Sequence, residues 1–197
     1  MKHTFVLFFF LSVTGLAAQK YADCDSANYI CHKSTYVFHQ CSGEGQNTKE
    51  ADWSSCFLNG TAAGEAEKNS TWMKFHIKEA GKLMFIIAPK DSLDDIDFVV
   101  FKLNEDGQCR KKMKEVRCMA AGDINMSQSP CTGKTGLWAT EKDKTEDAGC
   151  TDDGDNNFLA PLDVKPGEWY ALMVSNMTST TGFFIRFLGD AKLMCED

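Results

Sequence analysis

Nine cysteines in a chain of 197 residues constrain the fold more than any other feature of this sequence. In an exported protein, so many cysteines indicate a framework of disulfides. Because nine is odd, at most four bridges can form, and spacing alone does not fix the pairing. We predict two local bridges, Cys109–Cys118 across a basic loop and Cys131–Cys150 across a polar loop. Cys195 is expected to tie down the end of the chain.

The N-terminus predicts export. A charged start at Lys2 precedes an apolar run over residues 5–11, and small residues follow as far as Ala18. This order is typical of a secretory signal peptide, and the run is too short to span a bilayer. We therefore predict a signal peptide over residues 1–18, no transmembrane segment, and an extracytoplasmic location: secreted, at the cell surface or in the periplasm.

The charge balance restricts the partners. Lys and Arg number 21 and Asp and Glu number 28, which gives a net charge of −7. Such a chain repels a phosphate backbone, so we expect no nucleic-acid partner. An acidic surface suits divalent cations, although solubility alone also accounts for it.

Hydrophobic patterning predicts an all-β fold, because no segment has a sustained helical period. Met73, Phe75 and Ile77 alternate with polar residues, which places them on one face of a strand. Residues 83–88 are apolar on both faces, as in an interior strand. Strands joined by turn signals describe a β-sandwich or jelly roll. They are expected at residues 35–38, 72–77, 83–88, 96–103, 158–162, 169–174 and 183–188.

The predicted organisation has two parts after the signal peptide. Residues 19–56 form a cysteine-rich N-terminal segment, which disulfides staple to the sandwich. Residues 57–197 form the β-sandwich domain itself. Within that domain, residues 108–156 are polar and irregular, and we interpret them as one long loop, which is usually functional or mobile.

The order of the strand motifs resembles a known family. It is carried by Asn69-Ser70-Thr71-Trp72-Met73-Lys74-Phe75, Asp94-Asp95-Ile96-Asp97-Phe98-Val99-Val100-Phe101 and Gly167-Glu168-Trp169-Tyr170-Ala171-Leu172-Met173-Val174. These pieces resemble the N-terminal β-sandwich domain of secreted surface and gliding-motility-associated proteins of Bacteroidota. They are also distantly similar to pre-peptidase C-terminal domains and CUB-like jelly rolls. The resemblance implies a binding or structural role and brings no catalytic residues.

Two acidic clusters are candidate calcium sites, because calcium binds six to eight hard oxygen ligands. The alternative is that these are ordinary solvated turn residues, since turns favour Asp and Asn. Asp97 opens a strand and can instead bond the amides of a neighbouring loop. The candidate ligands are Asp152, Asp153, Asp155 and Asn156 in one cluster and Asp94, Asp95 and Asp97 in the other.

Cys31-His32 and His39-Gln40-Cys41 imitate part of a zinc site. In an oxidising compartment, we expect these cysteines to form disulfides with each other instead.

Two further surfaces are candidate binding sites. Trp138 lies in the polar segment, where an exposed indole can stack on a sugar or anchor a protein; packing over its own loop is the alternative. A basic patch between Cys109 and Cys118 can contact an anionic polysaccharide or an acidic partner, or be simply solvated. The patch contains Lys111, Lys112, Lys114 and Arg117.

The sequence contains none of the common catalytic motifs, including those of serine hydrolases, zinc proteases and nucleotide-binding enzymes. We therefore expect a non-enzymatic module that binds a protein or glycan at the cell envelope. One version is a subunit of a bacterial cell-surface, secretion or motility assembly. The other is a secreted, lectin-like adhesion protein, and a secreted hydrolase ranks third.

Overall fold

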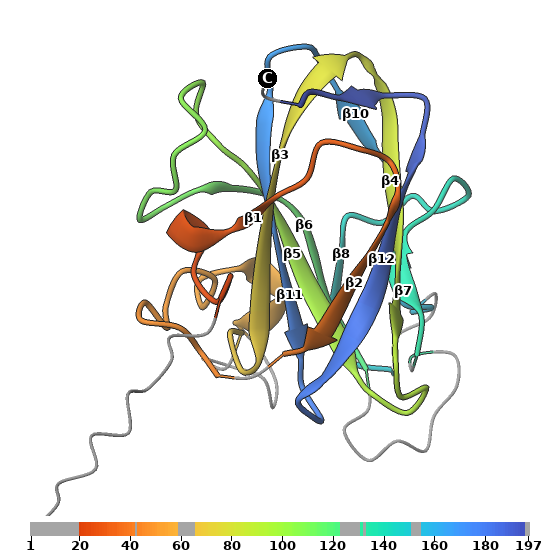
Figure 1. The fold of residues 1–197 in the computed structure, drawn as a ribbon. Helices are drawn as coiled ribbons and strands as arrows, with labels where there is room; N and C mark the ends of the chain where they lie inside the picture. Colours follow the sequence, from red (N-terminus) through yellow and green to blue (C-terminus); the bar gives the residue numbers. More distant parts are fainter. Residues whose placement is uncertain are drawn as a thin grey trace, which may run out of the picture.

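Two facing β-sheets form the body of the protein, which confirms the predicted β-sandwich (Figure 1). The computed structural model describes residues 20–41, 43–58, 66–122, 131, 133–150 and 155–195. The predicted signal peptide lies outside these residues. In this part of the chain, no helix has both the length and the apolar character needed to cross a membrane.

Sheet A contains seven strands in the order β1-β3-β11-β5-β6-β8, with β13 paired to β3. The pairs β1–β3 and β6–β8 are parallel, and the others are antiparallel. The strands are β1 (Asn28–Tyr29), β3 (Ser70–Glu79), β5 (Ile96–Lys102), β6 (Lys114–Ala121), β8 (Thr145–Gly149), β11 (Trp169–Asn176) and β13 (Lys192–Leu193).

Sheet B contains six strands in the order β2-β12-β4-β7-β9, with β10 paired to β4. Only the pair β7–β9 is parallel among the described strands of this sheet. The strands are β2 (Thr35–Gln40), β4 (Gly81–Pro89), β7 (Thr135–Leu137), β9 (Phe158–Leu159), β10 (Leu162–Val164) and β12 (Thr181–Gly189). Two short 3-10 helices, η1 (Cys24–Ser26) and η2 (Ser55–Phe57), belong to the N-terminal segment.

Each predicted strand is present, although the one at 158–162 is divided into β9 and β10. The prediction of one long loop over 108–156 was wrong, because β6, β7 and β8 lie within it. Strand β6 starts with charged residues and is rich in alanine, so its sequence has little strand propensity. Pairing with β5 on one side and β8 on the other makes it a strand nonetheless.

The main core lies between the sheets. Met73, Phe75 and Ile77 of β3 all point into it, as their alternation predicts. Phe85 of β4 packs against Phe98 of β5, with ring centroids 5.2 Å apart. Strand β4 is fully buried on one face only, since its alternate residues are half-buried or exposed. Strands β5 and β11 of sheet A and the short strand β7 of sheet B are buried on both faces.

A second core covers the outer face of sheet A. Trp72 of β3 is fully buried there and stacks on Phe101 of β5, with centroids 5.8 Å apart. Trp53 of the N-terminal segment reaches the same Phe101 ring at 5.4 Å. Phe57 of η2 is also fully buried in this cluster. The N-terminal segment, residues 19–56, therefore covers this second hydrophobic layer, and we call the segment the lid.

Disulfides fasten this lid. Three bridges join the N-terminal segment to the rest of the chain: Cys24–Cys109, Cys31–Cys195 and Cys56–Cys118. The predicted Cys131–Cys150 bridge is present, and Cys195 ties down the chain end as expected. The predicted Cys109–Cys118 bridge was wrong. Both cysteines belong to the second core, where each meets a cysteine of the lid instead.

Cys41 is the remaining cysteine and stays a buried thiol. Its sulfur accepts a hydrogen bond from Thr71 Oγ1 at 3.4 Å, and burial raises its pKa. A buried thiol with a raised pKa reacts slowly with alkylating agents.

We expect alkylation without reductant to label no thiol in the folded protein. After denaturation without reductant, one thiol should be labelled, and peptide mass spectrometry should place it at Cys41. Two or more labelled thiols after denaturation would contradict the four bridges.

Glu67 connects the lid to the start of β3. Its side chain is only 3% exposed, and its Oε1 accepts a hydrogen bond from the Ala51 backbone N–H at 2.9 Å. Burial raises the pKa of this carboxyl from 4.5 to about 8. The native state therefore holds a proton that the unfolded chain releases between these two pH values.

This proton makes stability depend on pH. The free energy of unfolding should fall as pH rises from 4.5 to 8, the two pKa values of Glu67. In Glu67→Gln, the amide resembles the protonated acid, so this part of the pH dependence should disappear. Urea unfolding at several pH values measures it, with Glu44→Gln at an exposed site of the lid as control. Parallel pH curves for the wild type and Glu67→Gln would refute the assignment.

Candidate functional site

The loop between β5 and β6 encloses a cleft of about 260 Å³. Its walls come from the end of β5, the loop itself and the first residue of β6. In Figure 1, this loop projects from the side of the sandwich as a green excursion. The lining residues are Lys102, Leu103, Asn104, Gln108, Arg110, Lys112, Met113 and Lys114.

A second hollow of about 480 Å³ adjoins the first, because both are lined by residues 102–104. Its other wall is the turn over residues 166–168 together with Trp169, the first residue of β11. Trp169 is half-buried. Its indole stacks on His76, with centroids 4.2 Å apart. Gly107, at a φ of 64°, lies so close that a Cβ there would come within 2.7 Å of the indole.

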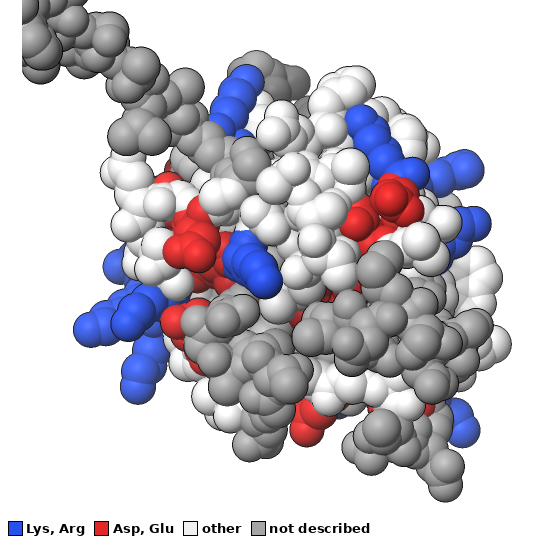
Figure 2. All heavy atoms as spheres, turned by 90° about the horizontal axis from the view of Figure 1, so that it is seen from below, with Lys and Arg blue, Asp and Glu red and all other residues white. Residues whose placement is uncertain are grey.

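The cleft carries positive charge on a negatively charged protein. Residues 110–114 include one Arg and three Lys and no acid. Figure 2 shows several basic side chains together at the left rim, the side on which Figure 1 places both this loop and the N-terminal segment. Among the described residues, no ion pair engages Lys111, Lys112 or Lys114. These three ammonium groups are therefore available to an anion.

Three carboxylates around the cleft already have partners, whereas Glu105, which lines the adjoining hollow, is exposed. Asp106 pairs with Arg110, and Glu115 accepts hydrogen bonds from the N–H and Oγ of Ser55, at 2.7 and 2.6 Å. Glu168 pairs with Lys102 at 2.5 Å. Burial alone would raise the pKa of Glu168, but hydrogen bonds, first that from Lys102, lower it below its usual range. The three paired acids therefore do not compete strongly for the three lysines.

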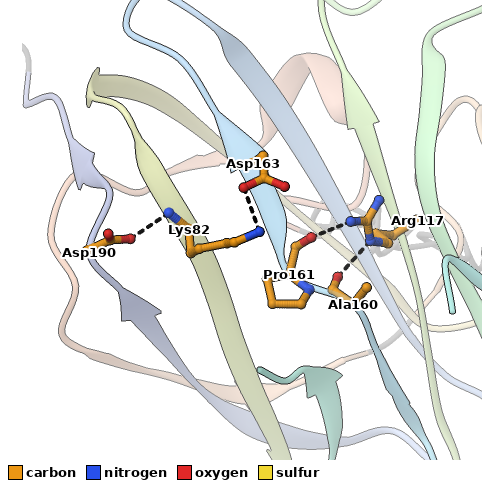
Figure 3. A network of polar contacts seen from close by, with 6 residues as sticks. All are labelled: Lys82, Arg117, Ala160, Pro161, Asp163 and Asp190. Atoms are coloured by element: carbon orange, nitrogen blue, oxygen red, sulfur yellow. Dashed lines mark hydrogen bonds and ion pairs between the residues drawn. The ribbon is translucent and has the colours of Figure 1, made fainter. Parts of the chain in front are cut away.

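Arg117 does not belong to this basic patch, so that part of the prediction was wrong. It is only 7% exposed and points between the sheets. Its guanidinium donates to the carbonyl oxygens of Ala160, at 2.7 Å, and Pro161 (Figure 3). Burial lowers its pKa. Arg117 thus links β6 of sheet A to the connection between β9 and β10 of sheet B.

Trp138 immediately follows β7, and its side chain is 42% exposed. Its backbone N–H donates to the Leu159 carbonyl at 2.8 Å, which holds the residue beside β9. The indole is therefore not enclosed by its own loop. Trp138 lines neither hollow, and its role in binding stays a prediction.

Asp94 is the centre of a hydrogen-bond network, although its sequence context predicted a calcium ligand. Its carboxylate accepts hydrogen bonds from Asn176 Nδ2 at 2.9 Å, Thr178 Oγ1 at 3.1 Å, Ser179 Oγ at 3.0 Å and Thr181 Oγ1. Burial would raise its pKa, but these bonds together lower it. The network joins the start of β5 to the turn between β11 and β12.

Asp95 and Asp97 are buried beside this network, at 4% and 2% exposure. Burial, and then the charge of Asp95, raises the pKa of Asp97 well above its usual value. Gly122 faces Asp95 so closely that a Cβ there would overlap its carboxylate.

The other predicted calcium cluster is only partly described. Asn156 donates to Glu141 Oε2 at 3.0 Å, whereas Asp152 and Asp153 lie outside the described residues. Calcium at either cluster stays a prediction. Among the residues that the structure describes, one group of three His, Cys, Asp or Glu side chains could hold a metal ion: Cys31, His32 and Cys195. The sequence grouped Cys31 and His32 with Cys41 and expected these cysteines to form disulfides with each other. That expectation was wrong, because Cys31 bonds to the distant Cys195 and Cys41 is a free thiol.

Removing the Asp94 carboxylate should be costly. We expect Asp94→Ala to lower the free energy of unfolding by about 3 kcal/mol, because the buried amide of Asn176 and three part-buried hydroxyl donors lose their acceptor. Since the folded pKa is lowered, this stabilisation is present at neutral pH and is lost as pH falls through that pKa. Asp91→Ala, at an exposed site three residues earlier, is the control, and urea unfolding at pH 7 compares the two. Equal losses in both variants would contradict the proposed network.

Comparison with known proteins assigns no family, because no family model and no curated protein matches the chain. Among solved structures, a surface-associated copper-binding protein of Methylomicrobium album BG8 is similar over 85% of this chain and 99% of that one. The sequence identity is 8% and the TM-score 0.41, so this likeness carries no argument about function.

Proposed function

We propose that this protein is an extracytoplasmic binding module whose basic cleft holds an anionic glycan. The observation that carries the proposal is the free cationic edge of the cleft. Lys111, Lys112 and Lys114 have no ion-pair partner among the described residues, while the chain as a whole has a net charge of −7. A local positive patch on an acidic protein attracts anions selectively.

The chemistry of the lining suits a charged sugar polymer. Lys112 and Lys114 offer ammonium groups to carboxylates or sulfates, and the amides of Asn104 and Gln108 can bond to hydroxyls. In the adjoining hollow, Trp169 adds an aromatic edge for the apolar side of a sugar ring. These contacts explain binding without cleavage, and we assign no catalytic residue.

The loop is fixed before any ligand arrives. Its Cys109 is bonded to Cys24 of the lid, and its Gly107 rests on the Trp169 ring. A pre-ordered loop loses less conformational entropy on binding than a free one. The four disulfides favour an oxidising, extracytoplasmic compartment, in keeping with the resemblance to bacterial surface domains.

A second candidate function is binding to a protein within a cell-surface, secretion or motility assembly. The exposed Trp138 favours it, because exposed aromatic side chains anchor many protein interfaces. This surface is built on β7 of sheet B, and the two surfaces can therefore be tested separately.

Neutralising the free lysines tests the cleft. We expect the triple variant Lys111→Gln, Lys112→Gln, Lys114→Gln to bind heparin or polygalacturonate at least tenfold more weakly, about 1.4 kcal/mol. The loss should shrink as salt is added, since exposed charges are screened. Titration calorimetry at low and high salt measures both effects. Dextran, a neutral polysaccharide, should not bind to either protein.

The matched control is Lys134→Gln, Lys142→Gln, Lys144→Gln, which removes the same charge from exposed lysines around Trp138. It should bind like the wild type. Equal weakening by both triple variants would reduce the effect to net charge and overturn the proposal. Binding to polyglutamate but to neither polysaccharide would assign the cleft to an acidic protein, and loss of binding only in Trp138→Ala would move recognition to β7.

A further inference from the structure

Three metal-binding side chains meet where the N-terminal segment touches the end of the chain. One ligand atom from each of Cys31, His32 and Cys195 lies within 4.8 Å of the other two. The imidazole of His32 approaches the Cys195 sulfur, with Nε2 at 3.3 Å and Nδ1 at 3.5 Å. In the structure, the two sulfurs form a disulfide. The imidazole therefore stands beside a bond that a thiol can open.

Of the four disulfides, this is the one in which neither cysteine is fully buried. Both Cys31 and Cys195 are half-buried, and His32 is exposed. Each of the other bridges contains at least one fully buried cysteine. These are Cys24 in the bridge to Cys109, both Cys56 and Cys118 in their shared bridge, and Cys131 in the bridge to Cys150. Exchange with an external thiol requires access to sulfur, so the Cys31–Cys195 bridge should be reduced first.

The two cysteines stay close when the bridge opens, because β3 holds the backbone next to each. The Ile30 N–H, just before Cys31, donates to the Lys74 carbonyl at 2.7 Å. The Met194 N–H, just before Cys195, donates to the His76 carbonyl at 2.8 Å. Tyr29 Oη also donates to the Met194 carbonyl at 2.7 Å. Reduction should therefore leave a pre-arranged pair of thiols.

His32 is held in place as well. Its backbone N–H donates to Tyr36 Oη at 3.2 Å, and Tyr36 Oη donates back to the His32 carbonyl at 3.1 Å. The backbone that carries the ring is therefore held in place when the bridge opens. Two thiols and one imidazole are left on a fixed frame.

We propose that Cys31, His32 and Cys195 form a redox-gated site for a thiophilic metal ion of the zinc class. A dithiol reductant opens the bridge: it is oxidised to its own disulfide, and the protein gains two thiols. Binding of Zn²⁺ then releases both thiol protons and forms two metal–sulfur bonds and one metal–nitrogen bond. Thiolate and imidazole ligands are the ones that zinc prefers, and three protein ligands leave a fourth position for water.

The same place thus has two alternative states. When oxidised, it is a staple between the lid and the chain end, and no sulfur is free to bind metal. When reduced, the metal ion replaces the covalent link and rejoins the same two segments. This inference is independent of the basic cleft and of any glycan bound there.

The test uses the full folded protein and Zn²⁺ alone. After limited treatment with dithiothreitol and its removal, one Zn²⁺ per chain should bind, and none should bind before reduction. Alkylation followed by mass spectrometry should label Cys31 and Cys195 in the reduced protein, and added Zn²⁺ should protect both. The buried Cys41 must remain unlabelled throughout, which shows that the protein is still folded.

Two variants test the role of the imidazole. His32→Ala should leave the reduction unchanged but weaken Zn²⁺ binding at least tenfold. His39→Ala removes another exposed imidazole, which lies on β2, and this variant should bind Zn²⁺ like the wild type. The proposal is overturned if the reduced, folded protein binds no Zn²⁺, if His32→Ala binds as tightly as the wild type, or if another bridge opens first.

Discussion

Burial of both faces of sheet A is the constraint on which the rest of the structure depends. A sandwich needs one apolar face on each sheet, but β3, β5 and β11 carry large apolar side chains on two. The outer layer around Trp72 and Phe101 would face water without the N-terminal segment. In its described residues, that segment has two short strands and two single-turn helices, too little secondary structure to be stable by itself. Its three disulfides supply the attachment that its own secondary structure does not.

The candidate binding site depends on the same attachment. The Cys24–Cys109 bridge holds the basic loop in place. Beside it, Ser55 of the lid donates hydrogen bonds to the Glu115 carboxylate. Without the lid, the loop would lose its anchor, and a free carboxylate would stand next to the lysines. The element that completes the core therefore also sets the charge and the rigidity of the cleft.

Sequence patterns predicted the strands in which apolar and polar residues alternate. Strands such as β3 and β12 have strong periodicity, whereas β6 is a strand only because β5 and β8 pair with it. Local spacing gave the short Cys131–Cys150 bridge correctly. It failed for Cys109 and Cys118, whose partners lie 85 and 62 residues away, because only the folded lid brings them together.

The residues of the candidate site, like the strands and disulfides, were predicted only in part. The lysines of the basic patch are exposed, as consecutive charges in a loop usually are. Arg117 was misassigned because side chains alternate along a strand, and its position in β6 turns it into the sandwich. Asp94 cannot be told from a metal ligand by sequence, because hydroxyl and amide donors from a distant turn satisfy it. The grouping of Cys195 with His32 likewise depends on β3, which aligns segments from both ends of the chain.

The buried acids make the stability of the domain depend on pH. Glu146, like Glu67, is buried, and burial, followed by the charge of Asp155, raises its pKa to about 7. Both carboxyls favour the folded state while protonated, so their contribution is lost as pH rises through 7 and 8. Asp94 acts in the opposite direction, since its pKa is lowered and its contribution is lost as pH falls through that pKa. Stability should therefore be greatest in weak acid, between these limits.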